Sequence, residues 1–213
     1  MPHRLLGVAV RGEKTHEVLA LIEQAEQLGL HAVWMTTGGA RLDSITIFAA
    51  AALRTQHIKL GTSIVPTFPR HPLVMVQQAQ VVAQLAPGRF RLGVGPSHRP
   101  TIEAMGIAFT SPLSHLREYL SILKALLQQG RVDMDGTYYK AHETIPEPFD
   151  LPVMASALQR GSFELCGEAA DGAISWICPG VYLRDVALPA MRLGAERIGR
   201  HPAALLEIGR AHV

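Results

Sequence analysis

The sequence predicts an α/β fold, a TIM-type (β/α)₈ barrel that is incomplete, with about six to seven of the eight units. Short apolar runs rich in β-branched residues alternate with helical patterns along the chain, as in parallel strands joined by helices. The first strand–helix turn, at 9–14, lacks the G-x-G-x-x-G motif of a dinucleotide-binding open sheet. The alternation therefore favours a closed barrel over a doubly wound sheet.

Three strand–helix units occupy the first part of the chain. The strands are expected at 5–10, 32–35 and 58–65, and the helices that follow them at 15–28, 44–53 and 73–85. Gly29 is suited to end the first helix, because glycine tolerates the left-handed conformation of a helix end. Pro66, Pro69 and Pro72 end the third strand, since proline cannot donate to a ladder, and Pro72 is well placed to open a helix.

The regular alternation stops after the fourth strand and resumes near residue 152. The later strands are expected at 90–94, 152–157 and 172–178, and the later helices at 161–170 and 182–199. Between them, 98–151 is interpreted as an insertion with a helix from about 114 to 129. A hairpin should follow at 131–143, with Asp135 and Gly136 as its turn, because Asp-Gly favours tight hairpin turns.

The overall composition of the chain limits the classes of partner that the protein can bind. The 213 residues are 48% hydrophobic, which is enough for one buried core. The formal charge of +2 comes without a basic run, which argues against a nucleic-acid surface. No apolar run reaches membrane-spanning length. Cys166 and Cys178 lack paired spacing and no leader pattern opens the chain, so a cytoplasmic protein is expected.

Two kinds of catalytic chemistry are not supported. The histidines show no metal-ligand spacing with cysteines or carboxylates, so no metal site is expected. No G-x-S-x-G motif is present, which argues against a hydrolase of that type.

The last seven residues, EIGRAHV at 207–213, can be encoded by GAG ATC GGA AGA GCA CAC GTC, a widely used sequencing-library adapter. We therefore expect 207–213 to be an adapter-derived tail and 1–206 to form a single, C-terminally truncated domain. The alternative is that a seventh strand begins near Leu205. On the truncation hypothesis, most of unit seven and all of unit eight are missing.

Four motifs carry a family resemblance: GTSIVPTFPRHP at 61–72, GRFRLGVGPSH at 88–98, HLREYLSILKALL at 115–127 and DGTYYKAH at 135–142. With them the chain resembles the luciferase-like monooxygenase superfamily, and within it the oxidoreductases that depend on coenzyme F-420, a deazaflavin. The resemblance implies a TIM barrel with the cofactor across the carboxyl ends of its strands. It also implies a small organic substrate and a homodimer.

The resemblance also implies a set of site residues. A non-prolyl cis peptide at Ser63-Ile64 would support the deazaflavin ring, and the loop at 157–161 would bind phosphate. His98 stands where sugar-phosphate-oxidising relatives have an acidic proton donor, so it becomes the candidate catalytic residue. The implied cofactor-binding residues are Thr36, Ser63, Ile64, Val65, Gly95, Pro96, Ser97, Ala157, Leu158, Gln159, Arg160, Gly161 and Trp176.

Three functions follow from these expectations. The first is hydride transfer between coenzyme F-420 and a small organic substrate. The second is an FMN-dependent monooxygenase, in which reduced flavin reacts with oxygen. The third is a truncated fragment that catalyses nothing, because a barrel that lacks strands leaves exposed sheet edges.

Overall fold

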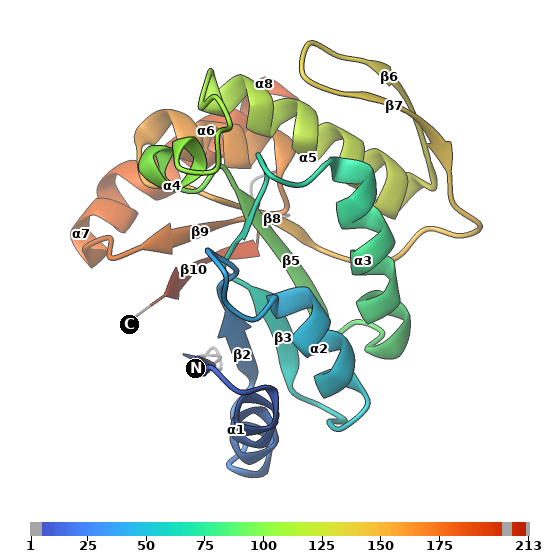
Figure 1. Ribbon diagram of the computed structural model, residues 1–213. Helices are drawn as coiled ribbons and strands as arrows, with labels where there is room; N and C mark the ends of the chain where they lie inside the picture. Colours follow the sequence, from blue (N-terminus) through green and yellow to red (C-terminus); the bar gives the residue numbers. More distant parts are fainter. Residues whose placement is uncertain (1–5, 202–205, 212–213) are drawn as a thin grey trace.

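The structure, a computed structural model, describes residues 6–201 and 206–211. One parallel sheet curls through the molecule with the helices outside it (Figure 1). Its strands are, in spatial order, β1 (Gly7–Ala9), β2 (Ala32–Met35), β3 (Lys59–Thr62), β5 (Phe90–Gly95), β8 (Val153–Ser156), β9 (Gly172–Trp176) and β10 (Leu206–Ala211). The short strand β4 (Val65–Pro66) also pairs with β5. The predicted barrel-type α/β fold is confirmed.

The helices cover the outer face of the sheet. They are α1 (Thr15–Gln27), α2 (Ser44–Ala52), α3 (Pro72–Leu85), α4 (Arg99–Glu103), α5 (Pro112–Gln129), α6 (Arg160–Ala169), α7 (Gly180–Tyr182), the π-helix η1 (Leu183–Ala187) and α8 (Leu188–Arg197). Their starts follow from local chemistry. Asp43 accepts the Thr46 N–H at 2.9 Å and so caps α2. Pro72 opens α3, where its missing N–H has no cost.

Side chains alternate between the two faces of the curled sheet, as they must along extended strands. Outward residues such as Leu92, Val94 and Ala155 join the hydrophobic core beneath the helices. Inward side chains of neighbouring strands contact one another. Trp34 of β2 is paired with Gly61 of β3, and a β-carbon built on Gly61 would lie 2.4 Å from the Trp34 ring. The Trp34 ring therefore packs over Gly61 on the inner face of the sheet.

The third strand is shorter than predicted. The expected strand at 58–65 is divided into β3 and β4 by Ser63 and Ile64, and the peptide bond between these two residues is cis, as the family resemblance implied. Across the division, Thr62 Oγ1 donates to the Gly93 carbonyl and accepts the Gly93 N–H, both at 2.8 Å. The Thr62 hydroxyl thus takes the place of backbone hydrogen bonds between β3 and β5 at the point where these two strands separate.

The insertion after β5 contains the predicted helix and hairpin, with two corrections. Short helix α4 was not expected. The hairpin strands β6 (Arg131–Asp135) and β7 (Lys140–Thr144) pair Asp135 with Lys140, so the loop is 136–139 and the Asp135-Gly136 turn was wrong. The Glu118 carboxylate in α5 explains the longer loop, because it accepts the N–H groups of Thr137 and Tyr138 at 2.9 and 2.8 Å.

The last described strand, β10, pairs in parallel with β9. It begins where the alternative of a seventh strand placed one, and it includes residues assigned to the adapter-derived tail. A backbone that pairs as a strand is compatible with either origin of the sequence, so the adapter origin stays a prediction. Residues 202–205 and 212–213 lie outside the described part of the chain.

Candidate functional site

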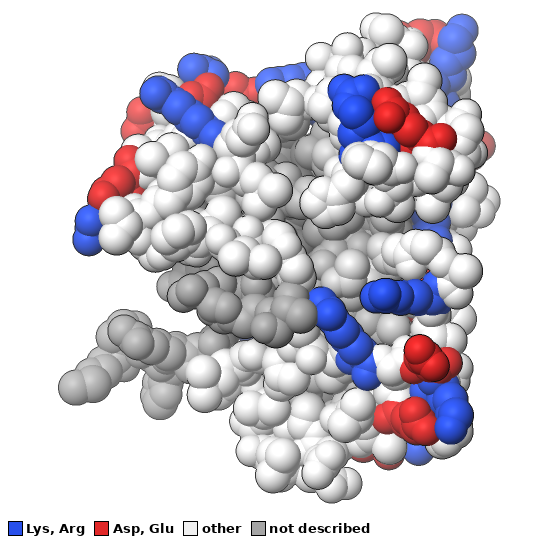
Figure 2. Space-filling view, turned by 60° about the vertical axis from the view of Figure 1, so that its left-hand side comes forward, with Lys and Arg blue, Asp and Glu red and all other residues white. Residues whose placement is uncertain are grey.

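The carboxyl ends of the parallel strands meet on one side of the barrel, the side on which TIM barrels carry their active sites. Three residues form a floor there: Ile64 between β3 and β4, Gly95 at the end of β5 and Ser156 at the end of β8. A β-carbon built on Gly95 would lie 2.0 Å from Ser156 Oγ and 3.5 Å from Ile64 Cδ1. In Figure 2, which brings the α7 side forward, the hollowed middle is largely uncharged.

Hydrogen bonds from the end of β2 hold the segment of Ser63 and Ile64. The Ser63 N–H donates to the Met35 carbonyl at 2.8 Å, and the Thr37 N–H donates to the Ile64 carbonyl at 3.1 Å. The Thr36 hydroxyl donates to the Ser63 carbonyl at 2.7 Å. Because the Thr36 hydroxyl donates its proton to the Ser63 carbonyl, the role of Thr36 is to position this segment.

The loop after β2 is tied to α2 and to the turn before α3. The hydroxyl oxygens of Thr37 and Ser44 are 2.6 Å apart, and Arg70 donates to Asp43 Oδ1 at 3.1 Å. Burial alone would raise the pKa of Asp43, but the hydrogen bonds from Thr46 and Arg70 outweigh it and lower that pKa. Asp43 thus stays ionised near neutral pH and keeps both loops in place beside the floor.

The loop between β8 and α6 differs in part from a simple phosphate loop. The N–H groups of Leu158 and Gln159 both donate to Ser162 Oγ at 3.1 Å. Arg160 Nε donates to Glu164 Oε1 at 3.0 Å, so the Arg160 charge is paired with a carboxylate of the same helix. The amides of Arg160 and Gly161 begin α6, where N–H groups have no helical partner and attract anions.

The end of β9 forms an apolar and strained wall. Trp176 is 37% exposed and Ile177 is 68% exposed. Ile177 has a φ of 49°, which is unfavourable for a β-branched residue. Ser97, just beyond β5, has a φ of 64°. Strained backbone of this kind is concentrated at functional sites in proteins, and here it follows β5 and β9, which flank β8, at the same end of the sheet.

His98 lies at the start of α4, just beyond the end of β5, and its side chain is exposed. Its carbonyl accepts the N–H groups of Thr101 and Ile102 at 3.0 and 3.1 Å. Among the residues that the structure describes, no hydrogen bond engages its imidazole. The ring is therefore available to exchange a proton at this edge of the site.

The structure brings most of the predicted site residues together, but not all of their side chains. Thr36, Ser63, Ile64, Gly95, Pro96, Ser97, Trp176 and the 158–161 loop lie at the same end of the barrel. Val65 and Ala157 instead belong to the hydrophobic core, so only their backbones face the site.

Sequence reasoning missed Ser156. This residue ends β8 one position before the predicted loop, and its Oγ packs against Gly95. Strand alternation offered a signal, because Ser156 is the polar residue on the inward side of a strand that is otherwise apolar.

Three further features of the described residues concern metal ligands, membrane-spanning helices and a hollow away from the floor. No group of three or more His, Cys, Asp or Glu side chains among them could hold a metal ion. None of the described helices combines the length and apolar character needed to cross a bilayer. A hollow of about 540 Å³ lies beside Pro152 and Asp171, which precede β8 and β9, so it is at the opposite end from the floor.

The fold and the site define a TIM-type barrel protein whose candidate site lies at the carboxyl ends of its strands. The chain belongs to the luciferase-like monooxygenase family, whose profile matches residues 2–213. It is 30% identical over 181 residues to a 5,10-methylenetetrahydromethanopterin reductase of Methanolobus tindarius, covering 84% of this chain and 55% of the relative. It is 33% identical over 205 residues to an F-420-dependent glucose-6-phosphate dehydrogenase of Beutenbergia cavernae, covering 89% of this chain and 61% of the relative.

A solved structure shares the fold. The coenzyme F-420-dependent tetrahydromethanopterin reductase of Methanopyrus kandleri superposes with a TM-score of 0.84 at 23% identity, covering 95% of this chain and 64% of that one. The chain spans about 55 to 61% of the length of the two curated relatives above.

Proposed function

We propose that this protein is an oxidoreductase that binds coenzyme F-420 on the floor of Ile64, Gly95 and Ser156 and transfers a hydride between it and a small organic substrate. The convergence of Ile64, Gly95 and Ser156 at the carboxyl ends of the strands carries the proposal, because a glycine beside a serine presents little side-chain bulk to a flat ring. The relative from Beutenbergia cavernae, 33% identical over 205 residues, carries an F-420-dependent name, which supports the same assignment.

The residues present fit such a cofactor. Small residues would face the ring, and the amides of Arg160 and Gly161 would receive a phosphate. When bound, the deazaflavin supplies a carbon that accepts or gives a hydride. The chain itself orients the ring through the segment of Ser63 and Ile64 held by Thr36. Trp176 excludes water from one side.

His98 is proposed to move the proton that accompanies hydride transfer. It lies beside the end of β5, and no hydrogen bond to the described residues engages its imidazole, which can both donate and accept a proton. His98→Gln should lower kcat by about 10²- to 10⁴-fold. The pH profile of kcat should lose one limb while the Kd for F-420 is unchanged. An unaltered pH profile would exclude His98 from proton transfer.

Titration of the 213-residue chain with F-420 and, separately, with FMN tests the cofactor. Quenching of F-420 fluorescence without FMN binding supports the proposal, and FMN binding alone would indicate the monooxygenase instead. The Gly95→Ala variant should not bind F-420, whereas Gly38→Ala should, because a β-carbon on Gly38 meets no atom within 4 Å. Hydride transfer between bound F-420 and a small organic substrate then separates an enzyme from a protein that only binds the cofactor.

We propose further that two copies of the chain associate through α3. This helix contains no charged residue, and Val74, Val81 and Leu85 on its outer side are 41, 46 and 36% exposed. Surface helices normally carry charge on such a face. Light scattering should show a dimer that Val81→Asp dissociates and that Leu28→Asp, at a position 72% exposed, does not. A monomeric wild-type chain would refute this association.

A cytoplasmic location is proposed from cysteine usage. Cys166 and Cys178 are both unpaired and buried, as expected for a protein kept in a reducing compartment. Fractionation of cells that express the protein should recover it with cytoplasmic markers. Recovery with a secreted or membrane fraction would contradict it.

A further inference from the structure

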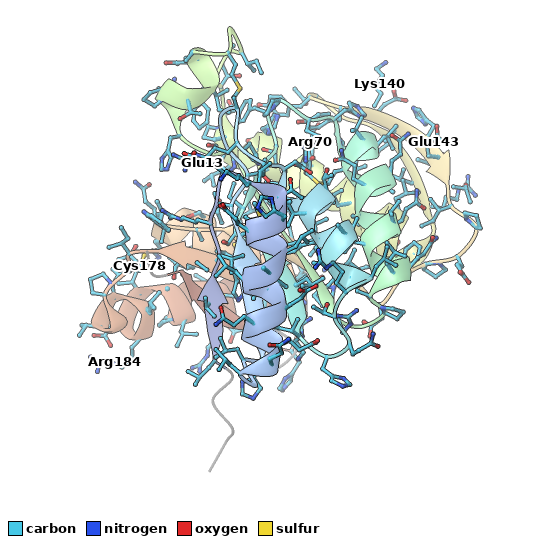
Figure 3. The ribbon with its side chains drawn as sticks, turned by 60° about the horizontal axis from the view of Figure 1, so that its bottom comes forward. Glu13, Arg70, Lys140, Glu143, Cys178 and Arg184 are labelled. Carbon is cyan, nitrogen blue, oxygen red and sulfur yellow. The ribbon has the colours of Figure 1, made fainter. Side chains whose placement is uncertain are left out.

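Residues 98–110, which include α4, have few polar contacts with the rest of the fold, and we call them the α4 segment. Their hydrogen bonds are internal, such as those from the Thr101 and Ile102 N–H groups to the His98 carbonyl at 3.0 and 3.1 Å. Within the described part of the chain, no hydrogen bond or ion pair joins the α4 segment to another element. Figure 3 shows α4, in pale green at the upper left, projecting from the edge of the molecule. Side-chain packing must therefore hold the segment in place.

Both ends of the α4 segment adjoin a residue in the left-handed region of the backbone. Ser97 precedes it with a φ of 64°, and Ser111 follows it with a φ of 42°. Few residues other than glycine adopt such angles. Hinges in proteins are formed by a few residues at the ends of elements, where small rotations move the chain between them. The α4 segment is thus a surface unit that can rotate as a whole unless packing prevents it.

Two side chains pack the α4 segment against the body of the protein. Ile102 is fully buried, which so short a helix cannot achieve alone. The Phe109 ring stacks on the ring of Phe68, in the turn between β4 and α3, with centroids 4.8 Å apart and planes 25° from parallel. Stacked aromatic rings attract each other beyond the effect of their buried area. Among the described residues, this stack is the only ring contact of the α4 segment with another element.

Phe68 provides a fixed platform for this contact. The imidazole of His115, in α5, stacks on Phe68 with centroids 3.9 Å apart and planes 2° from parallel. Two rings on one face of Phe68 would also contact each other. No ring contact joins Phe109 and His115 in the described residues, so Phe68 lies between them. The Thr67 N–H, next to Phe68, donates to the Gly95 carbonyl at 2.9 Å, which ties the turn to the floor of the site.

The Phe109 ring also contacts the residue beside His98. The Cζ atom of Arg99, which directly follows His98, lies 5.0 Å from the centroid of the Phe109 ring, within the range of a cation–π contact. Arg99 Nη1 donates to Glu103 Oε1 at 3.0 Å, which fixes the same side chain within α4. One ring thus contacts both Phe68, beside the floor, and Arg99, beside His98. The position of this ring decides where the start of the α4 segment lies.

We propose that Phe68 and Phe109 are positioning residues for His98. Their stacked rings dock the α4 segment on the turn beside the floor and so hold the imidazole at the edge of the site. Without the stack, the segment rotates about Ser97 and Ser111, and His98 leaves its place. This inference rests on the proposed function, in which His98 moves a proton beside bound F-420.

NMR relaxation of the 213-residue chain tests the docking without any activity. In Phe109→Leu, which removes the ring and keeps an apolar side chain, amide order parameters in the α4 segment, His98 included, should fall from about 0.85 to below about 0.6. Phe109→Tyr keeps the ring, and Met105→Ala changes a residue of the same segment that is 44% exposed, so neither should show this change. Unchanged order parameters in Phe109→Leu would overturn the proposal. If Phe109→Leu does not fold, Phe109→Met removes the ring and provides the same comparison.

Chemical modification of His98 tests its placement without turnover. Diethyl pyrocarbonate modifies exposed imidazoles, and mass spectrometry measures the extent at each histidine, with the exposed His16 of α1 as the reference. Bound F-420 should protect His98 in the wild-type chain and in Phe109→Tyr, and Phe109→Leu should lose this protection. Protection that persists in Phe109→Leu would overturn the proposal, as would a lack of protection in a wild-type chain that binds F-420. Failure of F-420 to bind would refute the proposed function instead, whereas the order parameters test the docking by Phe109 in either case.

Discussion

Ser156 Oγ occupies the space that a side chain on Gly95 would need, 2.0 Å from the position of its β-carbon. The two residues lie on the neighbouring parallel strands β8 and β5, whose register pairs Val94 with Ala155. A side chain on Gly95 would therefore meet the end of β8 rather than solvent. This contact gives the floor of the site its shape.

Gly95→Ala should destabilise the fold by about 1 to 3 kcal/mol, because overpacking a filled site forces side chains or backbone to shift. The free energy of unfolding in urea measures this loss. In the double variant that also carries Ser156→Gly the stability should return. The Oγ and Cβ atoms of Ser156, which conflict with the added methyl group, are then both absent. A double variant as unstable as Gly95→Ala would show that Ser156 is not the obstacle.

Gly61→Ala should also destabilise the protein by about 1 to 3 kcal/mol. The added methyl group would lie 2.4 Å from the ring of Trp34, the residue paired with Gly61 on the neighbouring strand. In a Trp34→Leu background the penalty should shrink, which a double-mutant cycle of urea unfolding would detect. Equal penalties in both backgrounds would place the conflict with the backbone instead.

Stability should fall as the pH is lowered from 6.5 to 4. Burial lowers the pKa of His115 to about 4, and Glu118 offsets only part of this effect. In this window the unfolded chain binds a proton that the folded protein does not, so acid favours unfolding, by at most about 1.4 kcal/mol per pH unit.

His115→Gln should flatten the acid limb in this window when unfolding is followed by urea titration at several pH values. Carboxylates with a lowered pKa, such as Asp171, begin to lose their stabilising effect only below about pH 5, so the two slopes are compared between pH 6.5 and 5. The hydrogen bond to Asp133 raises the pKa of His142, so the contribution of His142 to the free energy of unfolding stays constant below pH 6.5. An unchanged slope in the variant would contradict the assignment to His115.

Glu118→Gln should loosen the hairpin loop at 136–139. Burial would raise the pKa of Glu118, but hydrogen bonds from the amides of Tyr138, Thr137 and Tyr139 lower it, so a carboxylate is held there. Loss of its charge should weaken the loop by about 1 to 2 kcal/mol, or roughly five- to thirtyfold in amide exchange. Hydrogen exchange at 137–139 measures this, with the exposed Glu143→Gln as the matched control.

Element order, parallel pairing and most helix starts were predictable from residue chemistry. Pro72 and Asp43 mark helix starts through local effects, and local effects are visible in a sequence. The hairpin loop was predicted wrongly because its geometry depends on Glu118, which precedes it by about twenty residues and approaches it only in the folded chain. The residues of α4 gave no helical period to detect in so short a segment.

The candidate site was predictable in outline and incomplete in detail. Gly95 and the segment of Ser63 and Ile64 were found through family motifs, and the structure places them at one end of the barrel. Ser156 was missed because its importance depends on the register of two strands. The engagement of Arg160 by Glu164 likewise follows from helix formation and not from the loop motif.

Alternation along the strands divides the chain into two sets of positions that can change independently. Outward residues such as Leu92 and Ala155 hold the helices, while Thr36, Ser156 and Trp176 lie at the carboxyl ends of β2, β8 and β9. Variation at the second set alters what a ligand meets without repacking the layer beneath the helices. New ligand specificities could therefore evolve, or be engineered, on this barrel by changes of one residue per strand.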